Sequence, residues 1–394
     1  MRSKTCSLLV AAALLLAWAA DVAATEREDL GRALFFDTDL SWSRTQSCAT
    51  CHNPAHAFVD TRENALERAV SLGHEPDLIG QRNAPSIAYA GEIPPFETSA
   101  DGSWRGGLFL DGRVDSLESQ AAQPFVNPLE MAMPDHAALV SRVMAKPAYV
   151  DAIRALYGEA ALTDASEGLR AIADAIAAFE RGPLFSDFDS RYDRYLRGEY
   201  AMSLLEEQGR RIFFSDLVNC MQCHLQHPGR ALPDEPFTNF GYHNIGVPVN
   251  AVLQSAQGAA TPDAGLGARA EITDPRARGR FRTPSLRNVA LTAPYMHNGV
   301  FQDLRTALAF YNQYIVNNAA VRINPETEKP WGAPEIADNI DREILRQGQP
   351  LDDERITALI AFLRTLTDRR YEHLLPAPAA EPACSAAQGS SCAR

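Results

Sequence analysis

The chain carries two copies of a short pattern of cysteines and histidine that can bind a porphyrin covalently. In each copy two residues separate the cysteines, and a histidine follows the second cysteine directly. The copies are Cys48, Cys51 and His52, and Cys220, Cys223 and His224. Two thiols at this spacing can form thioether bonds to the edge of a haem, with the imidazole beneath the iron as proximal ligand. The pattern therefore predicts two haems of the c type.

Two other uses of these cysteines are chemically reasonable. The four thiols could bind one zinc ion, but zinc sites of this kind usually place their cysteine pairs roughly 15–20 residues apart. Here the two pairs lie in different halves of the chain. Each pair could also be a redox dithiol, which leaves the histidine after both pairs without a role. Covalent haem attachment accounts for both histidines, and we favour it.

The two halves also repeat sequence outside the haem patterns, which indicates an internal duplication. Residues 83–87 are echoed by 282–286, and residues 111–117 by 298–304. Twelve residues beyond the glycine of this second repeat, the first half has Pro124 and the second half has Tyr311. If the copies fold alike and this position faces the iron, the first haem is offered a residue that cannot ligate, and the second a phenol oxygen that can.

This difference predicts different roles for the two irons. The first should keep an open sixth position for a small molecule, whereas the second, bound by His224 and Tyr311, should serve for electron transfer. A phenolate stabilises ferric and higher states, whereas methionine raises the reduction potential. Met296 is a competing ligand that fits less well, because its paired position in the first half, Leu110, lies before the glycine. Tyr311 could also be a packed aromatic side chain without a ligand role.

Two residues that could act on bound peroxide lie on either side of Pro124 in the sequence. Gln120, Pro124 and Glu130 lie close together in the sequence. A carboxylate and an amide beside an open ferric haem could move the proton of bound peroxide and polarise its O–O bond. The alternative is that Glu130 caps a helix or pairs at the surface. His74 lies in a loop-like segment, from which it could reach the first iron and block it.

The beginning of the chain and its charge bear on location and partners. Residues 1–24 have the pattern of a cleavable export signal, because Arg2 and Lys4 precede an apolar run that is too short to span a bilayer. We therefore expect a periplasmic protein without a membrane span, in the compartment where bacteria attach c-type haem. The net charge of −13, from 37 basic and 50 acidic residues, argues against nucleic acid as a partner.

Apolar periodicity predicts a mainly α-helical, loop-rich fold with little or no sheet. Helical spacing occurs in residues 26–36, 136–157, 165–181, 204–214, 303–316 and 353–366. Residues 249–275 have the composition of a long surface loop. A chain of 394 residues can form two domains. We predict two cytochrome c-like haem domains related by the repeat, at 25–185 and 186–375.

The last residues of the chain, 376–394, are rich in alanine, proline and serine and are expected to be disordered. Cys384 and Cys392 lie in this tail. They could form a disulfide in an oxidising compartment, or the tail could have no role.

The chain resembles the bacterial di-haem cytochrome c peroxidase family, and within it the MauG-type enzymes of methylamine utilisation. The resemblance covers roughly residues 30–375. Its most specific segments are 47–52 (SCATCH), 127–134 (NPLEMAMP), 238–246 (TNFGYHNIG), 283–289 (TPSLRNV), 295–301 (YMHNGVF) and 310–312 (FYN). At the position of Tyr311, the di-haem cytochrome c peroxidases typically have methionine, and the MauG-type enzymes have tyrosine.

The resemblance implies an activity and partners. MauG-type enzymes use hydrogen peroxide, or oxygen plus electrons, to place both haems in a shared high-valent state that oxidises the precursor of methylamine dehydrogenase. Two tryptophans of that precursor become tryptophan tryptophylquinone, and a small electron-donor protein could also dock. The first alternative is a cytochrome c peroxidase that reduces peroxide with electrons from a small cytochrome or cupredoxin. The second is a non-catalytic di-haem electron carrier.

By position, the resemblance also assigns site residues. Gln120, Pro124 and Glu130 match the pocket over the open haem. A calcium ion held between the haems is matched by Asn83, Thr292 and Pro294. Calcium binds amide and carbonyl oxygens readily, with water completing its shell.

Two positions depart from the MauG-type pattern. Leu110 and Val218 stand where the resemblance implies tryptophans that act as electron-hopping stations. Neither leucine nor valine can be oxidised in this way. Trp104 and Trp42 could replace the missing aromatics, direct tunnelling could suffice, or the protein could oxidise a different substrate.

Overall fold

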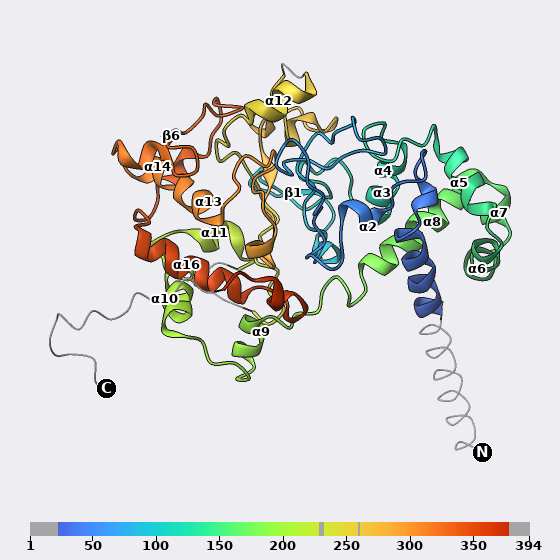
Figure 1. Ribbon diagram of the computed structural model, residues 1–394, viewed down its shortest axis with the longest axis horizontal. Coiled ribbons are helices and arrows are strands. Elements are labelled where there is room, and N and C mark those ends of the chain that lie inside the picture. Colours follow the sequence, from blue (N-terminus) through green and yellow to red (C-terminus); the bar gives the residue numbers. More distant parts are fainter. Residues whose placement is uncertain (1–22, 228–231, 259–260, 378–394) are drawn as a thin grey trace.

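The computed structural model describes residues 23–227, 232–258 and 261–377, and it confirms the predicted mainly helical, loop-rich fold. In this part of the chain, sheet is limited to three antiparallel ribbons of two short strands. In Figure 1 the first half, coloured blue to green, lies beside the second half, coloured light green to red. None of the described helices is long and apolar enough to cross a membrane. The predicted export signal at 1–24 and the tail at 376–394, with Cys384 and Cys392, lie almost entirely outside the described residues.

The first half contains a helix at 23–35, followed by α2 (Cys48–Cys51), α3 (Leu117–Ala121), α4 (Gln123–Val126), α5 (His136–Met144), α6 (Pro147–Tyr157), α7 (Ala160–Thr163) and α8 (Ala165–Glu180). The second half contains α9 (Arg191–Leu196), α10 (Leu204–Phe213), α11 (Cys220–His224), α12 (Ala251–Gln257), α13 (Leu304–Phe310), α14 (Asn312–Ile315), α15 (Arg342–Leu345) and α16 (Asp353–Thr365). The ribbons are β1 (Glu97–Thr98) with β2 (Trp104–Arg105), β3 (Tyr242–His243) with β4 (Phe281–Arg282), and β5 (Ile323–Asn324) with β6 (Lys329–Pro330).

Two predicted elements differ from the structure. The helix expected over 136–157 is split into α5 and α6, because proline disfavours helical backbone at the preceding residue, and Lys146 before Pro147 is extended. The loop expected over 249–275 contains α12, which begins where the side chain of Asn250 accepts a hydrogen bond from the Leu253 amide at 3.2 Å. It ends at Gly258 in the left-handed region.

Each half contains a crossing of two helices at a glycine. The helix before each Cys-X-X-Cys-His motif packs against the last long helix of its half, the helix at 23–35 against α8 and α10 against α16. A Cβ atom on Gly31 would lie 1.9 Å from the Ala175 carbonyl oxygen, and one on Gly209 would lie 1.8 Å from the Ala358 carbonyl oxygen. Only glycine allows so close an approach. The duplication therefore extends to helix packing, which the sequence repeat did not reveal.

The second sequence repeat forms the same loop in both halves. The Leu108 amide donates to the Val114 carbonyl at 2.7 Å, and the Tyr295 amide donates to the Phe301 carbonyl at 2.7 Å. Gly112 and Gly299 have left-handed backbone in the corresponding place. The glycines therefore align as the sequence predicted, and the same count along the chain leads to Pro124 in α4 and to Tyr311, the residue between α13 and α14.

A buried carboxyl joins the two halves. Tyr89 and Asn288 occupy repeated positions, and each precedes a short 3-10 helix, Ala90–Glu92 or Val289–Leu291. The Tyr89 hydroxyl donates to Asp368 at 2.5 Å, and the Asn288 amide donates to the other carboxyl oxygen at 2.8 Å. Burial is the main reason that the pKa of Asp368 is raised to about 6.

We predict that Gly209→Ala destabilises the protein, because the added methyl group collides with backbone of α16. Overpacking of this kind costs about 1–3 kcal/mol, of which the better helix propensity of alanine returns at most about 1 kcal/mol. Gly91→Ala is the control, since its Cβ would make ordinary contacts at 3.5 Å. Urea unfolding followed by circular dichroism measures both variants. Equal unfolding midpoints for the two would contradict the close crossing.

A second prediction concerns Tyr89→Phe, which removes the hydrogen bond between the halves. The cost should be about 1–3 kcal/mol when Asp368 is ionised and smaller when it is protonated. Because the folded pKa of Asp368 is about 6, the destabilisation should grow as pH rises from 5 to 7. Tyr149→Phe, which removes a bond to Asp37 inside the first half at 2.9 Å, is the control. A pH-independent difference between wild type and Tyr89→Phe would refute this assignment.

Candidate haem sites

The cysteines of both motifs lie on short helices and are unpaired. Cys48 and Cys51 are on α2, and Cys220 and Cys223 are on α11. Burial raises the pKa of Cys51 to about 11 and that of Cys220 to about 12, so these thiols are protonated rather than reactive thiolates. Within the described residues no three cysteine, histidine or acidic side chains converge as a metal site, which speaks against zinc.

The two motif histidines are oriented in the same way. His52 Nδ1 donates to the Phe58 carbonyl at 3.3 Å, and His224 Nδ1 donates to the Phe237 carbonyl at 3.4 Å. Burial lowers the pKa of both imidazoles, that of His224 to about 4, so both are neutral near pH 7. A neutral ring that donates from Nδ1 leaves the lone pair of Nε2 free for a metal. Both sites thus present the proximal ligand that a haem needs.

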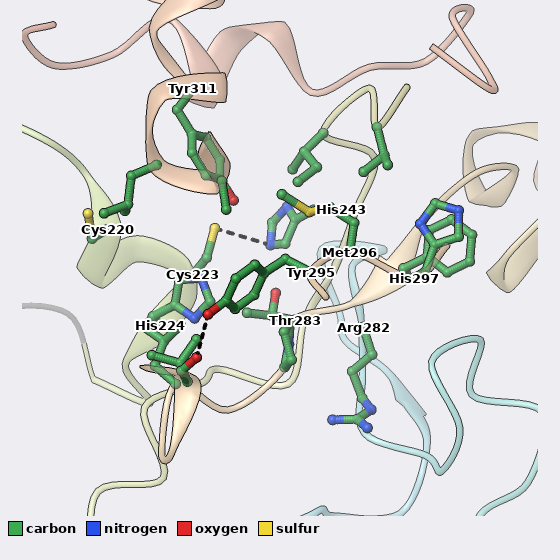
Figure 2. Close-up of a pocket in the computed structure, with 18 of the residues that line it drawn as sticks. Cys220, Cys223, His224, His243, Arg282, Thr283, Tyr295, Met296, His297 and Tyr311 are labelled. Atoms are coloured by element: carbon green, nitrogen blue, oxygen red, sulfur yellow. Dashed lines mark hydrogen bonds between the residues drawn. The ribbon is translucent and has the colours of Figure 1, made fainter. Parts of the chain in front are cut away.

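The residues of the second motif border a large cavity of about 350 Å³ (Figure 2). Cys220, Cys223, His224 and Tyr311 all line it, as a cofactor-sized site requires. The Tyr311 side chain is partly buried and its phenol forms no hydrogen bond within the described part of the chain, whereas the neighbouring Tyr314 hydroxyl donates to a backbone carbonyl at 2.8 Å. Burial raises the pKa of Tyr311, so an iron ion would have to displace its proton.

Met296 also lines this cavity, so the competing ligand remains available. The pairing that we expected for it is wrong. Because the loop of Leu108 to Val114 corresponds to that of Tyr295 to Phe301, Met296 pairs with Phe109, and both have left-handed backbone. Leu110 pairs instead with the residue after Met296.

The predicted distal residues lie on consecutive elements of the first half. Gln120 is on α3 and Pro124 is on α4. The turn that follows folds back, because the Met131 amide donates to the Pro124 carbonyl at 3.2 Å, and this brings Glu130 beside α4. Burial raises the pKa of Glu130, and the carboxylate forms no ion pair within the described residues. The charge of Glu130 also contributes to the raised pKa of the Cys51 thiol.

His74, which the sequence placed in a loop that could reach the first iron, is held in place by hydrogen bonds. It is buried, and its Nδ1 lies 2.7 Å from the Ser43 hydroxyl. Its amide donates to the Glu130 carbonyl at 2.8 Å, and its carbonyl accepts from Thr45 at 2.9 Å. These bonds fix His74 and hold the backbone of Glu130.

A second, small cavity of about 10 Å³ lies where the halves meet, and it has room for a single ion or water. The three predicted calcium residues, Asn83, Thr292 and Pro294, line it. So do Asp60 and Ser71, which the sequence did not indicate. The Ser71 hydroxyl is buried and has no nitrogen or oxygen partner within the described residues. Oxygen donors of this kind fit a calcium ion.

The tryptophans proposed as electron relays lie away from the large cavity. Trp104 packs against Tyr242 in a separate cluster, and Trp42 is 53% exposed. Neither lines the cavity, whereas Leu110 and Val218 both do. The positions at which the resemblance implies tryptophan therefore border the second site, but they carry aliphatic side chains.

Comparisons with known proteins identify relatives over most of the chain. A family model described as di-haem cytochrome c peroxidase matches residues 25–201. The chain is 51% identical to the methylamine utilization protein MauG of Paracoccus denitrificans, over 88% of this chain and 89% of that protein. It is 29% identical to the cytochrome c551 peroxidase of Pseudomonas aeruginosa, over 89% of this chain and 82% of that protein. The diheme peroxidase BthA of Burkholderia thailandensis has a similar structure, with a TM-score of 0.77 and 33% identity over 89% of this chain and 88% of that chain.

We predict that Tyr311→Met keeps both haems but raises the reduction potential of the second, because a thioether ligand favours ferrous iron relative to a phenolate. Haem content by pyridine haemochrome and a spectroelectrochemical titration measure the two effects. Tyr314→Phe is the control, because its hydroxyl is bonded to backbone and should not reach the iron. An unchanged potential in Tyr311→Met would show that the phenol is not a ligand.

Proposed function

We propose that this chain, which belongs to the di-haem cytochrome c peroxidase/MauG family of oxidoreductases, completes tryptophan tryptophylquinone in the precursor of methylamine dehydrogenase. Family membership implies two haems of the c type. The observation that carries the proposal is that the two halves have different residues at corresponding positions. The first half has Pro124, which cannot bind iron, and the second half has Tyr311, which can. One site is left open for peroxide, and the other is closed by a phenol.

The first site is proposed to handle peroxide and its protons. Bound at the two cysteine pairs, the haems would supply the iron chemistry that accepts the oxidising equivalents of peroxide. Glu130 would take a proton from one peroxide oxygen and return it to the departing oxygen, while the Gln120 amide orients the O–O bond. Burial raises the pKa of Glu130 above its usual range, which favours its acting as a proton donor as well as an acceptor.

The second site is proposed to exchange electrons with the partner protein. His224 and Tyr311, which line the same cavity, would both hold the iron of the second haem, so that no small molecule competes there. The cavity reaches Val218, next to the exposed side chain of Leu217, and this edge is where we expect the precursor to dock. A short distance between the cavity and the surface would compensate for the missing tryptophan. We also propose that the protein is periplasmic and exported by residues 1–24.

The alternative is peroxide reduction with electrons from a small cytochrome or cupredoxin. Similarity to the cytochrome c551 peroxidase of Pseudomonas aeruginosa favours it, as do the aliphatic residues Leu110 and Val218. Both functions use the same open site, so they differ in the identity of the electron source.

The test mixes the holoprotein, hydrogen peroxide and an immature methylamine dehydrogenase, and it follows the appearance of quinone absorbance. We expect quinone to form, and Glu130→Gln to slow its formation by about 10²–10⁴-fold. Glu118→Gln, which removes a carboxylate paired with Arg181 at 2.7 Å, should not change the rate. Rapid oxidation of reduced cytochrome c without any quinone would support the peroxidase alternative instead.

We further propose that the small cavity between the halves binds calcium through Asn83, Thr292 and Pro294, with Ser71 as an additional oxygen donor. Chelation should lower the rate of quinone formation, and calcium should restore it better than magnesium, which demands a tighter octahedral shell. Asn83→Ala should weaken calcium binding by about tenfold or more, since a hydrogen bond or oxygen contact to a charged group contributes about 1.5–3 kcal/mol. Calcium content by atomic emission checks the site directly, and full calcium occupancy in Asn83→Ala would contradict it.

A further inference from the structure

Arg282 is a buried cation without an acidic partner. Its exposed fraction is 8%, and no carboxylate lies within ion-pair distance of it in the part of the chain that the structure describes. Arg287 is also buried, but its charge is neutralised in the usual way: its guanidinium donates to both carboxylate oxygens of Asp193, at 2.8 and 2.9 Å. A buried guanidinium that lacks such a partner is unfavourable unless another anion neutralises it.

The backbone of the first half anchors Arg282 without neutralising it. Its amide donates to the Leu110 carbonyl at 2.8 Å, and its Nε donates to the Phe109 carbonyl at 3.4 Å. The acidic residue that follows these two, Asp111, is already bound by Arg82 at 2.6 Å and by Arg113 at 3.0 Å. The two terminal nitrogens of Arg282 are therefore held in place and remain available.

Arg282 lines the same cavity as the second Cys-X-X-Cys-His motif. Figure 2 shows it across this pocket from Tyr311, on the side that faces the loop of the first half. The cavity thus has a neutral imidazole and a phenol at one end and an unneutralised guanidinium at another. A ligand that fills it should carry a negative group at the Arg282 end.

We propose that Arg282 binds a carboxylate of the haem attached at Cys220 and Cys223, that is, one of its propionate side chains. The inference rests on family membership, which implies a haem in this cavity. Both oxygens of a planar carboxylate can accept hydrogen bonds from one guanidinium, which is the geometry that arginine recognises best. The bond would connect the second haem to the backbone of the first half through the carbonyl of Phe109.

The duplication gives this contact a consequence for the redox chemistry. At the position of Arg282 the first half has Asn83, which is uncharged, so this particular guanidinium has no counterpart in the first half. A positive charge near the iron stabilises the ferrous state relative to the ferric state. Arg282 therefore raises the potential of the second haem relative to the first, opposite in sign to the effect of the phenolate. It is a positioning residue that also sets the difference between the two potentials.

The test compares Arg282→Gln, Arg282→Lys and wild-type holoprotein. Spectroelectrochemical titration measures the potential of each haem, and resonance Raman spectroscopy measures the propionate bending band. We expect Arg282→Gln to lower the second potential more than the first and to shift the band. Arg282→Lys should restore the potential but not the band, because a single ammonium cannot bind both oxygens. Arg276→Gln is the charge control, since Arg276 is exposed and paired with Asp274.

Wild-type potentials and an unshifted band in Arg282→Gln would overturn the proposal. If that variant fails to fold, a structure of the wild-type holoprotein decides. A guanidinium nitrogen within about 3.2 Å of a propionate oxygen supports the proposal, and a propionate bound elsewhere refutes it. Quinone formation is measured separately. Its absence would refute the proposed function while leaving the Raman and potential comparisons valid.

Discussion

The hydrogen bond from each motif imidazole to a backbone carbonyl is the constraint on which both sites depend. A haem iron needs one ring nitrogen aimed at it, and the bonds of His52 and His224 to the carbonyls of Phe58 and Phe237 select that tautomer and ring orientation. Both phenylalanines have left-handed backbone, which turns their carbonyls toward the ring. The helices that cross at Gly31 and Gly209 form equivalent frames around the two sites.

With equivalent frames, differences in function must come from single side chains at repeated positions. Under the proposed function, Pro124 against Tyr311 would change whether the sixth position can be filled, and Asn83 against Arg282 changes the charge of the side chain at the repeated position. Under these proposals the second cavity would combine an anionic ligand, which favours ferric iron, with a fixed cation, which favours ferrous iron. Opposed effects of this kind allow a potential to be set by small changes in either group.

Much of the fold and of the candidate site could be predicted from sequence, because both rely on local patterns. Apolar periodicity located the long helices α8 and α16, and the Cys-X-X-Cys-His spacing located both attachment points. The split between α5 and α6 could have been predicted from Pro147, since proline restricts the residue before it. The helix α12 was missed because composition alone suggested a loop. The bonds that fix His74 were also missed, because they join segments about 30 residues or more apart.

Other site residues left no readable signal in one sequence. Phe58 follows His52 by six residues, but Phe237 follows His224 by thirteen, so no common spacing identifies the carbonyls. Asp60 and Ser71 meet their cavity only when the two halves pack together, and Arg282 lies far from the second motif in the sequence. The register of Met296 could be corrected only from the backbone bonds of its loop.

Electron paramagnetic resonance of the resting ferric holoprotein tests the central claim most directly, because it reports on the sixth position of both irons at once. Unequal occupation of the two repeated positions requires one high-spin signal from the first site and one low-spin signal from the second. Two low-spin signals, or two high-spin signals, would mean that Pro124 and Tyr311 do not distinguish the irons. The proposal that one half binds peroxide and the other transfers electrons would then be wrong.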